Sequence, residues 1–127
     1  MKIYVVGNSL VLEDSIPLQL LIKLKKKFPH VQIEEVDPNE NFIPEHGSII
    51  IDTVKGIDRT TVYDSLEVFE ATHSVSPHDY DLGFHLKLLQ KLHKILSVRI
   101  IGIPQNGYTS KIFKDVCQEI TKLDTAY

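Results

Sequence analysis

Short apolar runs alternate with helix-patterned stretches along the whole chain. Runs of β-branched and other apolar residues bounded by turn residues predict strands. The four clearest runs are residues 3–6, 31–36, 48–52 and 98–103, and shorter extended candidates are residues 60–63 and 66–69. The run at 48–52 is the most hydrophobic, and it ends on Asp52. It is therefore predicted to be a central strand, buried on both faces.

Three other stretches carry apolar residues at the spacing that places them on one face of an α-helix. These are residues 18–28, 82–96 and 109–123. Pro17 suits the first turn of the first helix, because the N–H that proline lacks has no helical partner there. Pro29 then ends this helix, since proline cannot continue the hydrogen-bonding pattern.

Strands that alternate with helices predict a largely parallel sheet with helices on both faces. We therefore expect an α/β fold, a three-layer sandwich with a mostly parallel, twisted central sheet of about five strands flanked by helices. The 127 residues fit a single domain, residues 1–127, around one core. The sequence contains no internal repeat, low-complexity tract or linker.

The charge and the cysteine content argue against several classes of protein. The net charge of −3 gives no reason to expect a nucleic-acid partner. The densest basic run, residues 23–27, falls at the end of the first helix, where positive charge suits the helix dipole. Cys117 is the only cysteine, and its helical neighbours indicate a structural thiol. Without a leader or an apolar run long enough to span a bilayer, we expect a cytoplasmic monomer that binds no membrane.

Candidate site residues follow the predicted strands. Ligands of parallel α/β sheets bind beyond the carboxyl ends of the strands. Acidic and imidazole side chains there are Glu13 and Asp14 after the first strand, Asp37 after the second, Asp52 on the third, and His73 and His78 before the helix at 82–96. The sequence thus predicts carboxylates and imidazoles at one edge of the sheet.

Most of these residues also have a purely structural interpretation. Glu13 or Asp14 would favour the start of the first helix, and Asp37 before a proline is a common turn residue. His78 follows a proline and would equally begin the next helix. Asp52 is harder to explain in this way, because a carboxylate at the end of a buried strand costs free energy unless a cation or donors compensate it.

Asp14, Asp52 and His78 together make a mixed oxygen and nitrogen ligand set. Such a set suits zinc, nickel or another divalent ion, and three protein ligands leave one position open for water or substrate. We interpret an open position as typical of a working site, whereas a structural metal is usually fully enclosed by protein ligands.

Four blocks of the sequence resemble the hydrogenase maturation endopeptidases. Residues 7–14, Gly-Asn-Ser-Leu-Val-Leu-Glu-Asp, resemble the Gly-Asn-x-Leu-x-x-Asp-Asp/Glu opening of that family. Residues 49–54 look like its central strand ending in Asp-Ala, and residues 76–78, Ser-Pro-His, followed by Leu82-Gly83 are similar to its Ser-x-His segment. Residues 101–104, Ile-Gly-Ile-Pro, look like its closing strand. The blocks occur in family order and span nearly the whole chain.

The resemblance implies a specific reaction, one cut that removes the C-terminal extension from the large-subunit precursor of a nickel-iron hydrogenase after nickel insertion. By this resemblance Asp14, Asp52 and His78 match the metal-coordinating positions. The nickel would come from the precursor itself, and zinc or cadmium would also suit the ligands. Glu13 or Asp37 is then the candidate general base.

Some positions depart from the family pattern and leave alternatives open. Ser15 and Pro17 stand where the family usually has glycine, and Glu13 could take the place of Asp14 as a ligand. One alternative is a non-catalytic, metal-sensing chaperone for the hydrogenase subunit. A receiver-type signalling domain is a weaker alternative, because the acidic pair lies well past the first strand and no lysine directly follows the last one.

Overall fold

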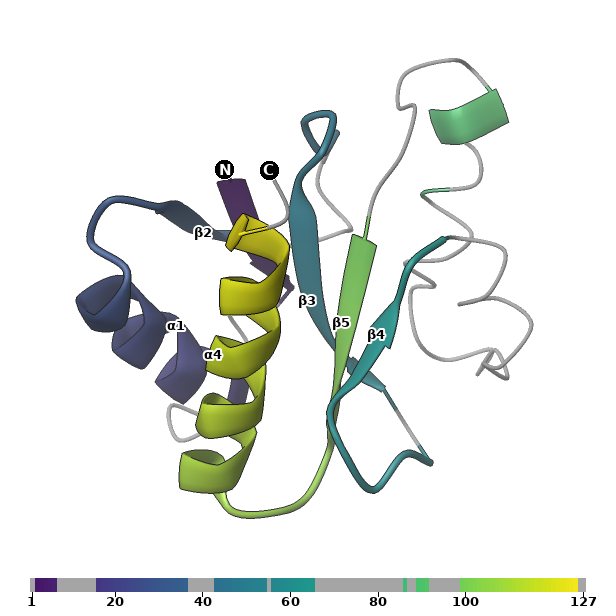
Figure 1. The fold of residues 1–127 in the computed structure, drawn as a ribbon. Coiled ribbons are helices and arrows are strands. Elements are labelled where there is room, and N and C mark those ends of the chain that lie inside the picture. The colour runs from purple at the N-terminus through teal and green to yellow at the C-terminus, as the bar shows by residue number, and fades with distance from the viewer. Residues whose placement is uncertain are drawn as a thin grey trace.

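A computed structural model of the chain describes residues 2–6, 16–36, 43–54, 56–65, 86, 89–91 and 99–125. Five strands and two long helices fall within these ranges (Figure 1). In chain order they are β1 (Lys2–Val6), α1 (Ile16–Lys27), β2 (Gln32–Val36), β3 (Ile49–Val54), β4 (Thr61–Tyr63), β5 (Arg99–Pro104) and α4 (Thr109–Thr125).

The strands form one sheet in the order β2-β1-β3-β5-β4. Strands β2, β1, β3 and β5 run parallel to one another, and β4 pairs antiparallel with β5. The predicted α/β class with a mostly parallel sheet is therefore confirmed, and β3 takes the predicted central position. Residues 55–60 join β3 to β4, and this connection is too short for the crossover that a parallel strand needs.

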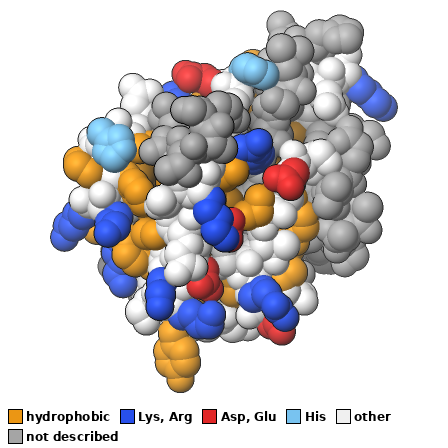
Figure 2. Space-filling view, viewed as in Figure 1, with side chains coloured by type: hydrophobic (Ala, Val, Ile, Leu, Met, Phe, Trp, Pro, Cys, Tyr) orange, Lys and Arg blue, Asp and Glu red, His pale blue; other side chains and the backbone are white. Residues whose placement is uncertain are grey.

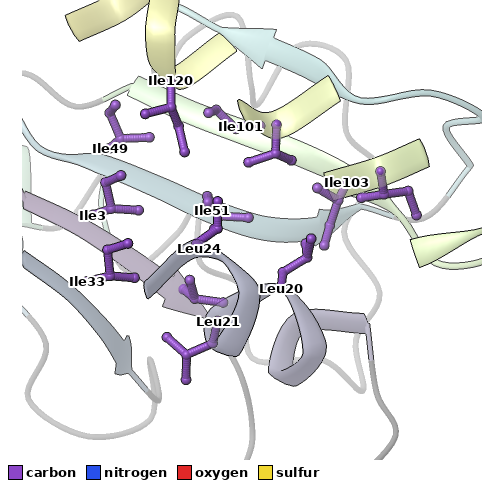
Figure 3. Packing of buried hydrophobic residues seen from close by; sticks show 13 residues of the cluster. Ile3, Leu20, Leu21, Leu24, Ile33, Ile49, Ile51, Ile101, Ile103 and Ile120 are labelled. Atoms are coloured by element: carbon purple, nitrogen blue, oxygen red, sulfur yellow. The ribbon is translucent and has the colours of Figure 1, made fainter. Parts of the chain in front are cut away.

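One face of the sheet is covered by α1 and α4, which lie side by side (Figure 1). Leu20 and Leu24 of α1 and Ile120 of α4 point toward this face and are fully buried (Figure 3). Alternate strand residues meet them, because side chains on a strand point to opposite faces in turn. They are Ile3, Val5, Ile33, Ile49, Ile51, Ile101 and Ile103. This face holds the larger of the two apolar clusters.

The other face holds a second apolar cluster. Its strand members are Tyr4, Ile50, Val54, Tyr63 and Ile100. Leu86 and Leu89, from the segment predicted as a helix at 82–96, are buried in the same cluster, and residues 89–91 have helical backbone. Both faces of the central strand are therefore covered, as its continuous apolar sequence predicts.

The boundaries of the elements differ from the predictions by one or two residues, and the difference in β3 bears on the candidate site. β3 does not end on Asp52, because Thr53 and Val54 continue the pairing with Ile103 and Pro104 of β5. α1 begins at Ile16, which leaves Pro17 in its first turn as predicted. The extended candidate at 66–69 lies outside the described residues. No helix within the described ranges is both long and apolar enough to cross a membrane.

Candidate functional site

The order of the strands creates a switch point between β1 and β3. The chain leaves β1 for β2 on one side, and then returns to β3 on the other side of β1. Connections from neighbouring strands β1 and β3 thus start in opposite directions. In open α/β sheets the ligand lies in the crevice that this divergence leaves outside the carboxyl ends of the strands.

Asp52 lies at this switch point. It directly follows Ile51, the last residue of β3 that pairs with β1. Its side chain is half-buried. Since strand residues alternate between faces, Asp52 shares the face of Ile50 and Val54, opposite to the one that α1 and α4 cover. The prediction that the third strand ends on Asp52 is wrong, because β3 continues to Val54, but Asp52 lies only two residues before the end of this central strand.

Gly102 of β5 lies directly beside Asp52 in the sheet register. A Cβ atom on Gly102 would come within 2.8 Å of Tyr63 Cε2 and 2.9 Å of Val54 Cγ2. The missing side chain therefore lets the ring of Tyr63, which β4 contributes, pack closely against the sheet next to Asp52. Our sequence interpretation did not single out Gly102, although a glycine inside an apolar strand is a known sign of such close approach.

We expect Gly102→Ala to lower the free energy of unfolding by about 1–3 kcal/mol, the usual cost of forcing an extra methyl into a packed core. The rigid β-branched side chain of Val54 on the neighbouring strand has little room to move away. Urea denaturation followed by circular dichroism measures the change. As a control, the Val54→Ala change should make Gly102→Ala less costly, so strictly additive effects of the two substitutions would contradict the steric explanation.

The exposed loop that follows β5 lies at the same edge of the sheet. Gln105, Asn106 and Tyr108 are exposed, and the Tyr108 side chain is among the most exposed large apolar groups of the described residues. The backbone of Gly107 has a φ of 140°, which few residues other than glycine adopt. These groups supply donors, acceptors and an aromatic surface beside the carboxyl ends of β3 and β5.

Of the predicted site residues, only Asp52 lies within the described part of the chain. Glu13, Asp14, Asp37, His73 and His78 lie outside it. The sequence positions of some of these residues still relate them to the sheet. The connection that contains Glu13 and Asp14 starts at the end of β1, and Asp37 directly follows β2. Strands β2, β1 and β3 are adjacent and parallel, so their carboxyl ends share one edge.

No group of three or more histidine, cysteine, aspartate or glutamate side chains that could hold a metal ion occurs among the described residues. Asp52 is the described carboxylate that stands at the switch point. A carboxylate in this half-buried position beside apolar side chains favours a cation or hydrogen-bond donors as partners. The predicted set of Asp14, Asp52 and His78 therefore remains a prediction.

Comparison with known proteins supports the fold. No family model matches the chain, and no curated protein sequence matches it. The chain is similar to a solved structure, the crystal structure of an uncharacterized protein from Wolinella succinogenes, with a TM-score of 0.57 and 15% sequence identity. The match covers 98% of this chain and 96% of that one. At this identity the likeness shows a shared fold alone, and the resemblance to hydrogenase maturation endopeptidases stays a prediction.

Proposed function

We propose that the chain is an endopeptidase that removes the C-terminal extension of a nickel-iron hydrogenase large-subunit precursor after nickel insertion. The observation that carries this proposal is the position of Asp52, a half-buried carboxylate on the central strand beside the switch point of the sheet. In the proposal, Asp14, Asp52 and His78 bind the nickel ion that the precursor brings. The enzyme acts as a monomer in the cytoplasm.

The proposal includes a three-layer architecture. Helices α1 and α4 form one layer, the sheet forms the second, and the helix predicted at 82–96 forms the third. Burial of Leu86 and Leu89 against the second face of the sheet supports this arrangement. Helices on both faces leave the carboxyl edge of the sheet as the accessible place for a substrate.

The chemistry follows from the needs of peptide hydrolysis, which requires an activated water and stabilisation of the oxyanion. A metal ion polarises the scissile carbonyl and lowers the pKa of water that binds to it. In the proposal Asp52 holds the substrate's nickel in place, which fixes the extension near the general base. Glu13 or Asp37 takes a proton from the attacking water as its oxygen bonds to the carbonyl carbon, and the departing amine receives a proton when the C–N bond breaks.

The proposal explains how one substrate would be selected. If the ligands of the site bind the nickel ion of the precursor, a precursor without nickel is not held at the site. Its extension is then not positioned for attack. Zinc or cadmium would suit the same ligands. Metal-dependent recognition would thus delay the cut until nickel is inserted.

The test is incubation of the purified chain with a nickel-loaded large-subunit precursor, followed by intact-mass measurement. We expect the loss of one defined C-terminal peptide from the nickel-loaded precursor and none from the nickel-free precursor. Cleavage of both at the same rate would contradict recognition through nickel. Tight binding of the nickel-loaded precursor without a cut would instead identify the non-catalytic chaperone, and labelling of Asp52 by acetyl phosphate would identify a receiver domain.

A further inference from the structure

Positive charge is concentrated on the two helices that cover the first face of the sheet. Helices α1 and α4 carry seven of the fourteen lysine and arginine residues but only three of the seventeen acidic residues. These helices therefore have a net charge of +4 in a chain whose net charge is −3. Viewed from the side of these helices, lysine side chains gather over both of them (Figure 2).

A shallow groove of about 680 Å³ lies beside the C-terminal end of α1 and runs along α4. We call it the lysine groove. Phe113 and Cys117, one turn apart on α4, provide its apolar surface, and Lys27, Lys114 and Lys122, which we call the rim lysines, also line it. Among the described residues, no acidic side chain lines it. The groove therefore combines an apolar floor with a rim of a single charge.

The floor of the lysine groove is anchored to the core. Phe113 and Cys117 are both partly buried and pack against the larger apolar cluster. The ammonium group of Lys23 lies 5.7 Å from the centre of the Phe113 ring, which adds a cation–π contact between α1 and α4. Burial raises the pKa of the Cys117 thiol, although nearby Lys27 acts in the opposite direction. The thiol is therefore neutral at pH 7, and the floor carries no charge.

Two of the three rim lysines have no ion pair within the described residues. Among the described residues, Lys27 and Lys114 have no carboxylate within ion-pair distance. Lys122 Nζ lies 3.5 Å from Glu119 Oε1, but the Lys122 side chain is 71% exposed, and ion pairs of this kind contribute little. The positive charges of Lys27 and Lys114 therefore raise the local potential at the groove and attract an anionic partner.

We propose that the lysine groove docks an acidic segment of a partner protein. Carboxylates of the segment pair with the rim lysines, and an apolar side chain of the segment covers Phe113 and Cys117. This surface lies over α1 and α4, whereas Asp52 is on the opposite face of the sheet. The docking surface and the candidate catalytic site can therefore be occupied together, and the docking proposal does not depend on the proposed proteolysis.

The chemistry of the groove favours a protein segment over a small anion such as phosphate. The groove meets α1 at its C-terminal end, where free carbonyl groups rather than N–H groups are found. Its charged groups are lysines, with none of the arginine forks that grip a phosphate from two sides. A small anion would also leave the apolar floor uncovered. A flat bilayer surface would cover the apolar floor less closely than a side chain that enters the groove.

The test uses a fluorescein-labelled, helical amphipathic peptide of glutamate, leucine and alanine at an ionic strength of about 0.15 M, where charges more than about 8 Å apart are largely screened, with binding measured by fluorescence anisotropy. The groove variant is Lys27→Glu with Lys114→Glu. The matched control is Lys25→Glu with Lys26→Glu, which makes the same change in net charge on exposed residues that do not line the groove. We expect the groove variant to weaken binding about tenfold or more and the control to weaken it less than about threefold, since rim charges act mainly over short distances in salt.

Two further readouts keep the result independent of folding defects. Circular dichroism should show that both variants stay folded, with a thermal midpoint only slightly below that of the unaltered chain, because all four lysines lie on the surface and three of them are in the last turn of α1, where positive charge suits the helix dipole. In the unaltered chain, ¹⁵N NMR should show the largest peptide-induced shifts at Cys117 and Thr121, which line the groove. Shifts centred on another surface would overturn the proposal.

Several outcomes would contradict the proposal. Equal weakening in the groove variant and the control would mean that net charge alone attracts the peptide. Absence of saturable binding, or equal binding of a peptide with glutamine in place of glutamate, would exclude an acidic-segment site. Competition by inorganic phosphate at equal charge would indicate a small-anion site, and groove-dependent binding to phosphatidylserine vesicles without peptide binding would indicate a membrane surface.

Discussion

Replacing Leu24 by alanine is expected to lower the free energy of unfolding by about 2–5 kcal/mol, the range for truncating a large buried aliphatic side chain. Leu24 is fully buried on α1 and points at the sheet (Figure 3). The truncation removes transfer free energy and leaves a cavity that the β-branched residues of the sheet, with their restricted side-chain rotamers, fill poorly. The loss is large beside the roughly 5–15 kcal/mol by which domains are stable.

Ile22→Ala is the matched control for this prediction. It lies two residues away on the same helix and removes the same number of carbon atoms, but the Ile22 side chain is 51% exposed. Its effect should stay within about 0.5 kcal/mol, because surface changes cost little and alanine is the better helix former. Urea denaturation by circular dichroism measures both variants. Similar losses for Leu24→Ala and Ile22→Ala would mean that α1 does not pack on the sheet through Leu24.

The parallel part of the fold could be predicted from the sequence because its signals are local. The run Ile49, Ile50 and Ile51 shows a strand that is buried on both faces, and the structure confirms it. The end of β3 was missed, because the pattern of apolar residues is interrupted at Asp52 while the pairing with β5 continues. That pairing joins residues fifty positions apart in the sequence, and such long-range contacts leave little trace in a local pattern.

The strand with which β4 pairs could not be predicted from the sequence. The extended character of Thr61 to Tyr63 was predicted, and the short connection after β3 excludes a parallel neighbour. Nothing in the residues of β4 shows that it pairs with β5 instead of β3. In the structure β3 is paired on both sides, by β1 and β5, so β4 takes the outer edge of β5, where the absence of a side chain at Gly102 makes room for Tyr63.

The candidate site could likewise be predicted only in part. Asp52 could be predicted because a charge inside a continuous apolar run conflicts with burial, and the structure places it at the switch point. Its face could not be predicted, since that depends on which side of the sheet α1 and α4 cover. This face matters for the two proposals, because it separates Asp52 from the lysine groove, so the proposed substrate and the proposed acidic segment would contact different surfaces.

Asp52→Asn is expected to reduce cleavage of the nickel-loaded precursor by more than about 100-fold, beyond the losses found when groups that merely orient metal ligands are changed. Asparagine has nearly the same shape as aspartate but no charge. The fold should therefore persist while binding of a divalent cation is lost. His78→Ala should show the same defect. Asp58→Asn is the matched control, because it makes the same chemical change at a side chain that is 91% exposed, and it should cleave at the rate of the unaltered chain. Intact-mass measurement over time gives each rate, and an Asp52→Asn variant that retains full activity would refute the role proposed for this carboxylate.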